Sequence, residues 1–343
     1  GLAMWSLAEL AHANGQTREE LLAGASWDEL RDRLARTEHG REFVVAWDRF
    51  MAEHGHHCRG ELEFCNPRWS ETPHYILGLV RNYLRSMPQV DVTEHRRRLI
   101  SQREALVEQC RRRLRNPVKR LLFTWSLRRT CQLLIDRENW KDEVVRLLAA
   151  GRKFLLTLGE RLSREGILSD RDDIFFLKLT EIESVAKRTE DVDVKQRIAT
   201  RRADYEKNCS VTPPPVVIGR FDPDKYVAPP VDATTGVLNG IPVSPGVVTG
   251  RARVILRTDD HEHVKAGEIL VAPFTDPAWT PYFLSAAAVV MDMGGVASHG
   301  AIIAREYGVP AVANVGPASK IIKTGQEICV DGDRGTVTIL DQA

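Results

Sequence analysis

A single histidine stands where its side chain can act as a nucleophile. The stretch Gly294-Gly-Val-Ala-Ser-His-Gly300 follows an apolar run and precedes a run with helical spacing, so His299 is expected in the first turn of a helix. Backbone N–H groups are unpaired there and the helix dipole is positive, which favours an anion and keeps the imidazole neutral. A neutral imidazole can attack a phosphoryl group, and the resulting phosphohistidine would lie against N–H donors. The simpler alternative is an ordinary helix start, in which Ser298 is the N-cap and His299 has no chemical task.

Two expected strands and one expected helix would hold this histidine. An apolar strand at 288–291 leads into the two glycines, which leave space beside the imidazole. The helix is expected at 300–307, where Ala301 helps to keep one helix face small, and Gly308-Val-Pro310 ends it. A second apolar strand follows at 311–315, so the histidine would lie between two buried strands.

The chain divides into two parts of different composition. Residues 1–210 contain 4 of the 17 prolines and 10 of the 24 glycines, whereas 211–343 contain 13 and 14. The first part has the apolar spacing of helices, and the second has short apolar runs between glycines and prolines, which predict strands and turns. We expect helical elements at 94–115, 121–134, 143–162, 174–187, 280–287 and 300–307. We expect strands at 243–248, 251–256, 269–272, 288–291, 311–315, 327–330 and 336–340.

The predicted fold class is therefore multidomain, with an α part and an α/β part. A mainly helical domain at 1–210 is expected to bind the acceptor of any transferred group. A proline-rich linker at 211–237 contains Thr212-Pro-Pro-Pro215 and Val227-Ala-Pro-Pro230, which would be extended and fairly stiff. A compact β/α domain at 238–343 follows and carries the histidine.

Charge and cysteine usage exclude several classes of protein. The 48 Lys and Arg residues against 47 Asp and Glu leave a net charge of +1, so no global field attracts nucleic acid or a membrane. No apolar run approaches the roughly 18 residues of a membrane span. The six cysteines are widely scattered, as in a reduced, cytoplasmic protein.

One local excess of positive charge stands out against this balance. The stretch 91–130 holds 12 Lys and Arg residues against four acids. Arginines at this density usually form a solvated helix face, and the alternatives are phosphate binding to a nucleic acid or a docking surface for a phosphate-loaded partner domain. We expect neither a nucleic acid nor a membrane as a partner.

Two segments resemble a known family. Gly294-Gly-Val-Ala-Ser-His-Gly-Ala-Ile-Ile-Ala-Arg-Glu-Tyr-Gly-Val-Pro-Ala-Val312 closely resembles the signature of the phosphohistidine swivelling domain of PEP-utilising enzymes. Gly240-Ile-Pro-Val-Ser-Pro-Gly-Val-Val-Thr-Gly-Arg-Ala-Arg-Val254 resembles the opening strands of that domain, so the likeness covers residues 238–341. The Ser-His-Gly-Ala form, and a helical part before the histidine part, are typical of the rifampicin phosphotransferase branch. Ala297 stands where dikinases place a regulatory threonine.

The resemblance implies a carrier histidine and its partners. His299 would be phosphorylated, and Gly295, Ser298, Gly300 and Arg305 would support the phosphate. ATP and Mg2+ would be bound by an ATP-binding domain or subunit outside this chain. The sequence of this chain has no Walker-type phosphate loop, and we expect this chain to hold no tightly bound cofactor. The phosphoryl group would pass to a hydroxyl of a small molecule bound by the helical domain. The chain would then be the C-terminal portion of a multidomain enzyme, or a subunit that accepts phosphate in trans.

Two other functions stay open beside phosphotransfer. Phosphorylation turns a hydroxyl into a leaving group, so a dehydratase that phosphorylates its substrate transiently is one alternative, and it would need a general base at the acceptor carbon. A non-catalytic phosphocarrier or scaffold that keeps the fold is the other.

A second group of candidate residues lies between 54 and 69. Zinc is suggested by His54, His56, His57, Cys58 and Cys65, but their spacing matches no familiar zinc finger and we expect no metal. The pattern Gly-His-x-x-x-Gly-Glu followed by Pro-Arg-Trp resembles the helical domain of rifampicin-phosphotransferase-like proteins, which have arginine where His57 stands here. The resemblance implies substrate contacts from His56, Arg59, Glu61 and Arg68. The segment 169–177 and the pair Arg137-Glu138 also look family-like, although the residues alone indicate a capped helix start and a surface charge pair.

Overall fold

The chain forms a helical region followed by a mixed β-sheet. The computed structural model describes residues 2–87, 92–188, 193–209, 211, 219, 236–257, 264–276 and 279–340. Contacts divide the chain into unit 1, made of 1–55, 69–135 and 231–343, and unit 2, made of 56–68 and 136–230. Most of the expected linker at 211–237 lies outside the described residues. Helices before residue 210 and a mixed sheet after residue 236 confirm the predicted combination of α and α/β parts.

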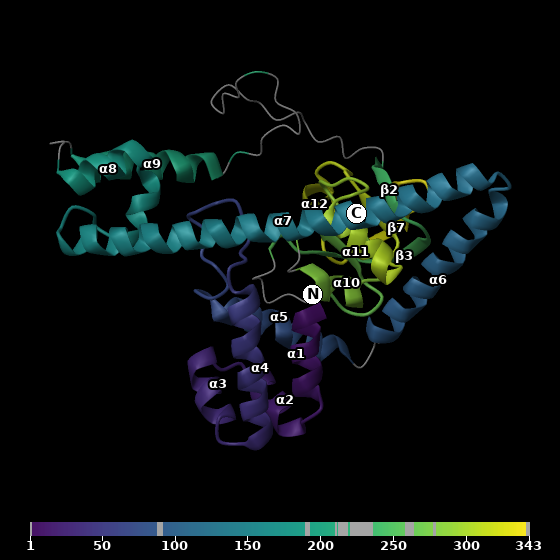
Figure 1. Cartoon of the computed structure of the whole chain (residues 1–343), viewed down its shortest axis with the longest axis horizontal. Coiled ribbons are helices and arrows are strands. Elements are labelled where there is room, and N and C mark those ends of the chain that lie inside the picture. The colour runs from purple at the N-terminus through teal and green to yellow at the C-terminus, as the bar shows by residue number, and fades with distance from the viewer. Residues whose placement is uncertain are drawn as a thin grey trace. The chain divides into compact units, whose positions relative to one another are not determined.

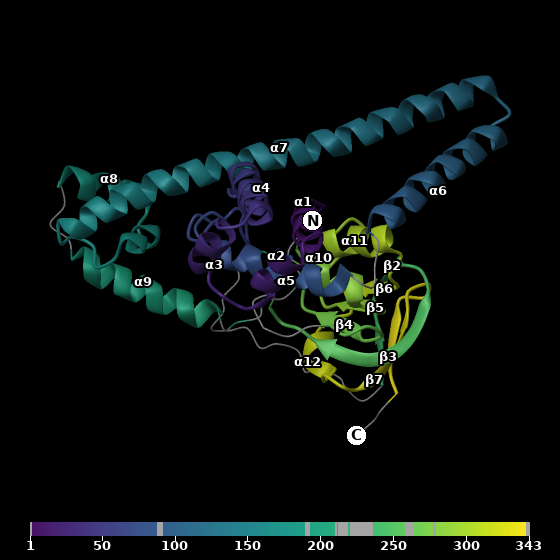
Figure 2. The same ribbon diagram turned by 90° about the horizontal axis from the view of Figure 1, so that it is seen from below.

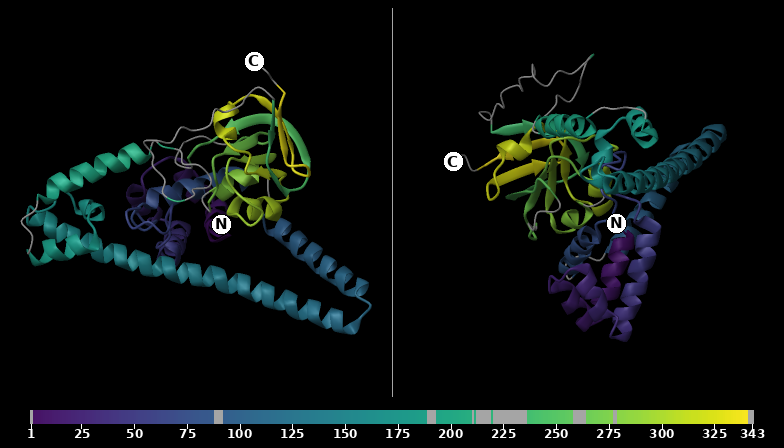
Figure 3. Two further views of the ribbon diagram at one scale, coloured as in Figure 1. Left: turned by 90° about the horizontal axis from the view of Figure 1, so that it is seen from above. Right: turned by 90° about the vertical axis from the view of Figure 1, so that its left-hand side faces the viewer.

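Five helices pack around one apolar core in unit 1 (Figure 3). They are α1 (Leu2–His12), α2 (Gly15–Leu22), α3 (Trp27–Leu34), α4 (Glu38–His54) and α5 (Pro73–Ser86). Asn14 caps α2 by accepting a hydrogen bond from the Thr17 backbone N–H. The stacked rings of Trp27 and Trp47, whose centroids lie 4.1 Å apart, join α3 to α4 within the core. These helices are therefore fixed by local caps and by burial of large aromatic side chains.

The next two helices are α6 (Val92–Arg113) and α7 (Pro117–Arg164), which meet at a short turn and diverge from it (Figure 1). The expectation of separate helices at 121–134 and 143–162 is wrong, because α7 is continuous over 48 residues. The residues between them contain neither glycine nor proline, and their long polar side chains favour a helix. The apolar spacing in this region does not indicate which side chains are buried, since Leu121 is 72% exposed and Trp125 is 59% exposed.

Unit 2 contains the C-terminal part of α7, a short 3-10 helix η2 (Arg171–Phe176), α8 (Leu179–Lys187) and α9 (Val194–Cys209). Figure 1 shows α8 and α9 beside this end of α7, and Leu162, Ile182 and Ile198 meet in their common core. The single element expected at 174–187 is two elements. Asp170 begins η2 with a capping box, and the backbone becomes extended at Leu177 before α8 starts.

Eight strands form the sheet of unit 1, in the order β1-β8-β7-β3-β4-β5-β6-β2. They are β1 (Val237–Asn239), β2 (Ile241–Ser244), β3 (Val247–Val254), β4 (Ile269–Ala272), β5 (Ala288–Met291), β6 (Ala311–Ala313), β7 (Glu327–Asp331) and β8 (Thr336–Ile339). Strands β3 to β6 pair in parallel and the other neighbours pair antiparallel. Figure 2 shows β3 as a long curved strand; its first half pairs with β7 and its second half with β4.

Alternate residues of the central strands enter two different cores. In β4, Leu270 enters the core covered by α10 (Thr280–Ser285) and α11 (His299–Tyr307), whereas Ile269 enters the core that includes α12 (Ala318–Ile321). The same period of two continues in β5, where Val289 and Val290 belong to opposite cores. Both faces of the parallel strands are therefore buried, as their continuous apolar runs require.

The main departures from the expected strands have local causes. The expectation of a single strand at 243–248 is wrong, because β2 ends at Ser244 and β3 begins at Val247. Pro245 has no N–H for pairing, and Gly246 takes a φ of 118°, which favours glycine. The strand expected at 251–256 is the second half of β3, while β1 and α12 were not expected from the sequence.

Within the part of the chain that the structure describes, no helix combines the length and the apolar character that a membrane span requires.

Candidate functional site

His299 is the first residue of α11, at the carboxyl ends of the parallel strands β4 and β5. The chain passes from Met291 at the end of β5 through six residues to the N-cap, Ser298. Backbone hydrogen bonds tie this loop to its neighbours: Met293 N donates to Pro273 O, and Val315 N donates to Met291 O. The edge outside the carboxyl ends of parallel strands is where ligands usually bind in such sheets. The sequence-predicted placement of His299 in the first helical turn is thus what the structure has.

Glycines let α11 lie very close to the sheet. A Cβ on Gly300 would lie 2.1 Å from Thr275 Oγ1 and 2.4 Å from Met291 Sδ, so a side chain there meets two atoms at once. Gly294 has a φ of 152°, and a Cβ on it would lie 3.1 Å from the Ser298 hydroxyl. A Cβ on Gly295 would meet nothing within 4 Å. One side of the loop is therefore packed against the sheet and the other is open.

Ser298 and His299 present polar atoms that are shielded from solvent. Ser298 has the extended backbone of an N-cap, yet its side chain makes no capping hydrogen bond. Its Oγ is buried and has no hydrogen-bond partner among the atoms of the described residues. The His299 ring is half-buried, and its Nε2 atom is enclosed. Because buried hydroxyls are nearly always hydrogen-bonded, the Ser298 hydroxyl is a ready donor to an anion at the start of α11.

Arg305 is bound to the backbone on both sides of this loop. Its Nη1 donates to the Val243 carbonyl at 3.0 Å, and its Nη2 donates to the Val296 carbonyl at 2.6 Å. Val296 lies inside the loop that carries the histidine, and Val243 lies in β2. The guanidinium therefore fixes the loop to the sheet, whereas the sequence predicted that it supports the phosphate.

Asp292 fixes the segment around Ser319, which lies near the same edge of the sheet as the histidine loop. Its carboxylate accepts hydrogen bonds from the backbone N–H of Ser319, at 2.8 Å, and from the Ser319 hydroxyl. Burial raises the pKa of Asp292, although these hydrogen bonds and nearby Lys320 oppose the rise. Sequence reasoning missed Asp292, because an acid after a buried strand gives no sign of which later residue it will contact.

The candidate residues at 56–61 form a polar cluster in unit 2. His56 Nε2 lies 2.7 Å from Asp142 Oδ1, and His57 Nδ1 lies 2.7 Å from Glu61 Oε1. Lys141 Nζ lies 2.7 Å from the other oxygen of Glu61. The structure therefore brings together two predicted residues, His56 and Glu61, with the unpredicted pair Lys141 and Asp142.

Burial and hydrogen bonding set the charges of this cluster. Burial raises the pKa of Glu61, but the hydrogen bonds from His57 and Lys141 outweigh it and hold that pKa at about 2. Burial lowers the pKa of His56, so its ring is neutral near pH 7. The pKa of Asp142 is raised by burial and lowered more strongly by hydrogen bonds from His56 and Arg146, with a net decrease. The cluster thus combines a neutral imidazole with two carboxylates that stay ionised.

The two candidate arginines of this segment have different surroundings. Arg68 is 2% exposed, and its guanidinium donates to Cys58 Sγ at 2.6 Å and to the Glu61 carbonyl at 3.1 Å. Arg59 is exposed. Arg68 therefore supports the loop from within, whereas Arg59 lies at the surface.

The two further family-like segments have simple structural explanations. Arg137 and Glu138 form an exposed ion pair, 2.6 Å between Nη2 and Oε1. The carboxylate of Asp173 accepts from the backbone N–H groups of Ser169 and Asp170 and closes a capping box. Both observations agree with the surface charge pair and the capped helix start that the residues alone indicate.

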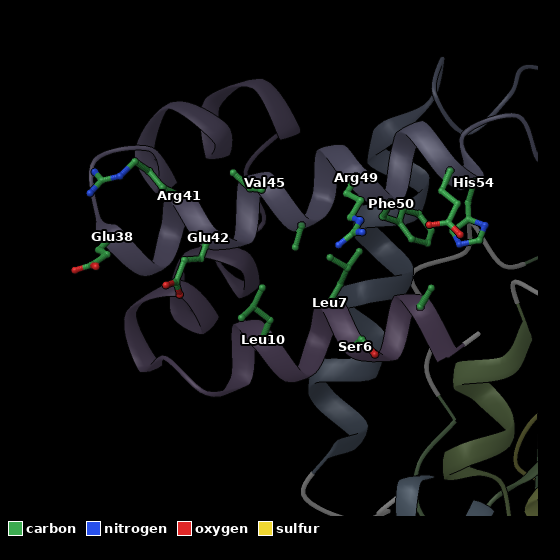
Figure 4. Close-up of a pocket in the computed structure, with 13 residues that line it drawn as sticks. Ser6, Leu7, Leu10, Glu38, Arg41, Glu42, Val45, Arg49, Phe50 and His54 are labelled. Atoms are coloured by element: carbon green, nitrogen blue, oxygen red, sulfur yellow. The ribbon is translucent and has the colours of Figure 1, made fainter.

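Described residues of unit 1 line at least two surface grooves. One, of about 1030 Å³, lies between α1 and α4; Figure 4 shows Leu7 and Leu10 of α1 facing α4, with charged side chains such as Arg41 and Arg49 along it. The other, of about 630 Å³, is lined by α6, α7 and α11, with Leu106 and Phe123 among its apolar side chains. The second groove shares α11 with His299, one helix turn further along at Ile302.

Comparison with known proteins covers both parts of the chain. The family described as "Rifampicin phosphotransferase fourth domain" matches residues 1–138, and "PEP-utilising enzyme, mobile domain" matches residues 264–335, which include His299. The rifampicin phosphotransferase of Streptomyces sviceus is 33% identical, over 99% of this chain and 39% of its own length. That of Bacillus subtilis is also 33% identical, with the same two coverages. Chondramide synthase of Chondromyces crocatus is 31% identical, over 98% of this chain and 9% of its own length.

The chain thus spans about two fifths of the length of the two rifampicin phosphotransferases, 39% in each case. The match to them covers nearly the whole of this chain, and the mobile-domain match contains the loop, the N-cap and the helix that hold His299. The chain belongs to the PEP-utilising enzyme family, in its rifampicin phosphotransferase-like branch.

Proposed function

We propose that the chain is the histidine-carrying component of an ATP-dependent phosphotransferase. His299 accepts a phosphoryl group that originates from ATP and passes it to a hydroxyl of a small molecule bound by the helical domain, 1–210. The linker at 211–237 lets the histidine domain, 238–343, move between donor and acceptor. ATP and Mg2+ bind to an ATP-binding domain or subunit other than these three segments. The placement of His299 at the start of α11, in a chain whose relatives are phosphotransferases, is the observation that carries this proposal.

The first step loads the histidine. A lone pair of an imidazole nitrogen attacks phosphorus, an N–P bond forms, and the P–O bond to the leaving phosphate oxygen breaks with its electron pair. The N–H groups of the first turn of α11 and the Ser298 hydroxyl donate to the phosphoryl oxygens. Gly295 leaves open space on this side, Gly300 allows α11 to approach the sheet, and Arg305 holds the loop in place.

The second step transfers the phosphoryl group to the acceptor. The hydroxyl oxygen attacks phosphorus, the N–P bond breaks, and the electron pair returns to the imidazole, while the hydroxyl proton passes to a base. We assign the acceptor contacts to His56, Arg59 and Glu61, because His56 has a neutral imidazole, Glu61 has an ionised carboxylate, and Arg59 is an exposed residue of the same segment. Arg68 serves this site indirectly, because its guanidinium is hydrogen-bonded inside the loop.

The loading step is tested by mass spectrometry. The chain is incubated with ATP, Mg2+ and the ATP-binding portion of a rifampicin phosphotransferase, and an acid-labile gain of one phosphoryl group is expected. His299→Ala should abolish the gain, and His39→Ala, which removes an exposed histidine on α4, should leave it unchanged. Equal labelling of wild type and His299→Ala, or no labelling of the wild type, would refute the proposal.

The acceptor step needs its own experiment. Loaded protein is mixed with a panel of hydroxylated natural products, and the products are analysed for a phosphorylated adduct or for loss of water, which separates a phosphotransferase from a dehydratase. Arg59→Ala should leave the loading of His299 intact and slow the loss of its phosphate to the acceptor. If no acceptor discharges the phosphohistidine, the non-catalytic phosphocarrier replaces the proposed function.

A further inference from the structure

Three side chains of unit 2 offer metal-ligand atoms to one point in space. His56, His57 and Asp142 each present one such atom, and the three atoms all lie within 4.8 Å of one another. The two imidazole rings lie side by side, with centroids 4.2 Å apart. Both ring Nε2 atoms face the same carboxylate oxygen, Asp142 Oδ1, at 2.7 Å for His56 and 3.2 Å for His57. Asp142 comes from α7, so the fold assembles the group from residues far apart in sequence.

A second layer of side chains orients these three. The Nδ1 atom of His57 lies 2.7 Å from Glu61 Oε1, which fixes the ring so that Nε2 points towards Asp142. In metal sites, ligating histidines characteristically donate their other ring N–H to a carboxylate in this way. Arg146 Nε donates to Asp142 Oδ2 at 2.9 Å and so turns Oδ1 towards the two rings. The supporting contacts of a metal site are therefore present together with its ligands.

We propose that His56, His57 and Asp142 bind a zinc ion through Nε2, Nε2 and Oδ1. Two imidazoles and one carboxylate are a usual ligand set for zinc, with a fourth position left for water or substrate. Bonds of about 2.0 Å in tetrahedral geometry place ligand atoms about 3.3 Å apart, close to the 3.2 Å between His57 and Asp142. The 2.7 Å between His56 and Asp142 is a hydrogen-bond length, so on metal binding the ring proton of His56 moves from Nε2 to Nδ1, the Nε2 lone pair binds the ion, and Nε2 and Oδ1 separate by about half an ångström.

The nearby cysteines and cations are compatible with this site. Cys58 Sγ accepts a hydrogen bond from Arg68, and Cys58 is not part of the group of ligands, unlike in a zinc-finger arrangement. Lys141 and Arg146 bind the carboxylate oxygens of Glu61 and Asp142 that face away from the group. Each cation thus balances a carboxylate without occupying a ligand atom.

Metal binding is measured directly on the 343-residue chain, without any phosphotransfer assay. The metal-free protein is titrated with Co2+, whose visible absorption reports tetrahedral coordination, and Zn2+ is then added to displace it. One Co2+ per chain with tetrahedral bands, displaced by Zn2+, is expected. His57→Ala and Asp142→Asn should each weaken binding at least tenfold, and Glu61→Gln should weaken it by roughly 10-fold to 100-fold through the orientation of His57.

The control is His54→Ala, which removes a histidine just before the site that is not in the group. This variant should bind Co2+ like the wild type, and circular dichroism of every variant checks that it is folded. The proposal is overturned if the wild type does not bind Co2+ or Zn2+, or if His57→Ala and Asp142→Asn bind as tightly as it does. The zinc proposal is also overturned if His54→Ala weakens metal binding as much as His57→Ala does. None of these outcomes depends on whether His299 carries phosphate, so the zinc site and the loading of His299 fail independently, although His56 and Glu61 are shared with the proposed acceptor site.

Discussion

Replacing Arg305 separates the two roles that this side chain can have. The structure gives it a positioning role, because its two terminal nitrogens hold the Val243 and Val296 carbonyls. A phosphate contact, which the sequence predicted, would depend mainly on positive charge. Arg305→Lys keeps the charge but lacks the planar fork that reaches two carbonyls, whereas Arg305→Met removes the charge and both hydrogen bonds while keeping an aliphatic stem.

The expected size follows from the two hydrogen bonds. Hydrogen bonds to charged groups contribute about 1.5–3 kcal/mol each, and an exposed position such as this one reduces the contribution to about 1 kcal/mol. Arg305→Met should therefore lower the free energy of unfolding by about 2 kcal/mol. Arg305→Lys, which can keep one of the two bonds, should lower it by about 1 kcal/mol. If the same energies hold the loop in its reactive geometry, loading of His299 slows about 30-fold and about 5-fold, respectively.

Urea unfolding and the rate of phosphohistidine formation are the two measurements. Arg251→Met is the matched control, since Arg251 is also exposed and donates one hydrogen bond to a backbone carbonyl, that of Gly325. It should lose a little stability and load at the wild-type rate. A full loading rate in Arg305→Lys together with a slow rate in Arg305→Met would refute the positioning role and establish the phosphate contact.

Three further changes test other features. Ser298→Ala should alter the free energy of unfolding by less than about 0.5 kcal/mol, because its hydroxyl makes no capping bond, yet it should slow loading; a loss near 1 kcal/mol in urea unfolding would contradict this. Gly300→Ala should cost about 1–3 kcal/mol in the same assay, because its Cβ meets Thr275 Oγ1 and Met291 Sδ, and an unchanged stability would show that the site is looser than described. Hydrogen bonds from an arginine hold the pKa of Glu181 at about 2, below its ordinary 4.5, so its contribution is complete above pH 4.5 and lost as the pH falls towards 2. The unfolding free energies of wild type and Glu181→Gln should therefore differ at pH 6 and converge near pH 2, and a difference that is constant with pH would rule this out.

The histidine loop is the part that the sequence predicted best. Strand, glycines, N-cap and helix are contiguous there, so local patterns determine where His299 lies. Where the apolar pattern contains proline or glycine, the element boundaries differ from those expected. Pro245 and Gly246 separate two strands where one was expected. In α7 the polar stretch around Asp136 suggested a break, but polar residues on an exposed helix need no break.

The polar cluster shows what local patterns cannot supply. His56 and Asp142 are 86 positions apart, and no spacing rule links a histidine in a loop to an acid in the middle of a long helix. In the sequence, three histidines and two cysteines between 54 and 65 suggested zinc, but their spacing matched no zinc finger and we expected no metal. The fold instead directs Cys58 to the buried Arg68 and directs the histidines to Asp142. Contacts of this kind become visible only when the packing of unit 2 is known.

The enclosed Nε2 atom of His299 limits what this nitrogen can carry in the conformation described. The unmodified ring fits an arrangement in which this nitrogen has no exposed surface. A phosphoryl group on that nitrogen, as the proposed function allows, would need room for three oxygens and would disfavour this arrangement. A modification that fits one conformation better than another shifts the population between them. If His299 carries phosphate as we propose, the loaded and empty forms should differ in hydrogen exchange around α11.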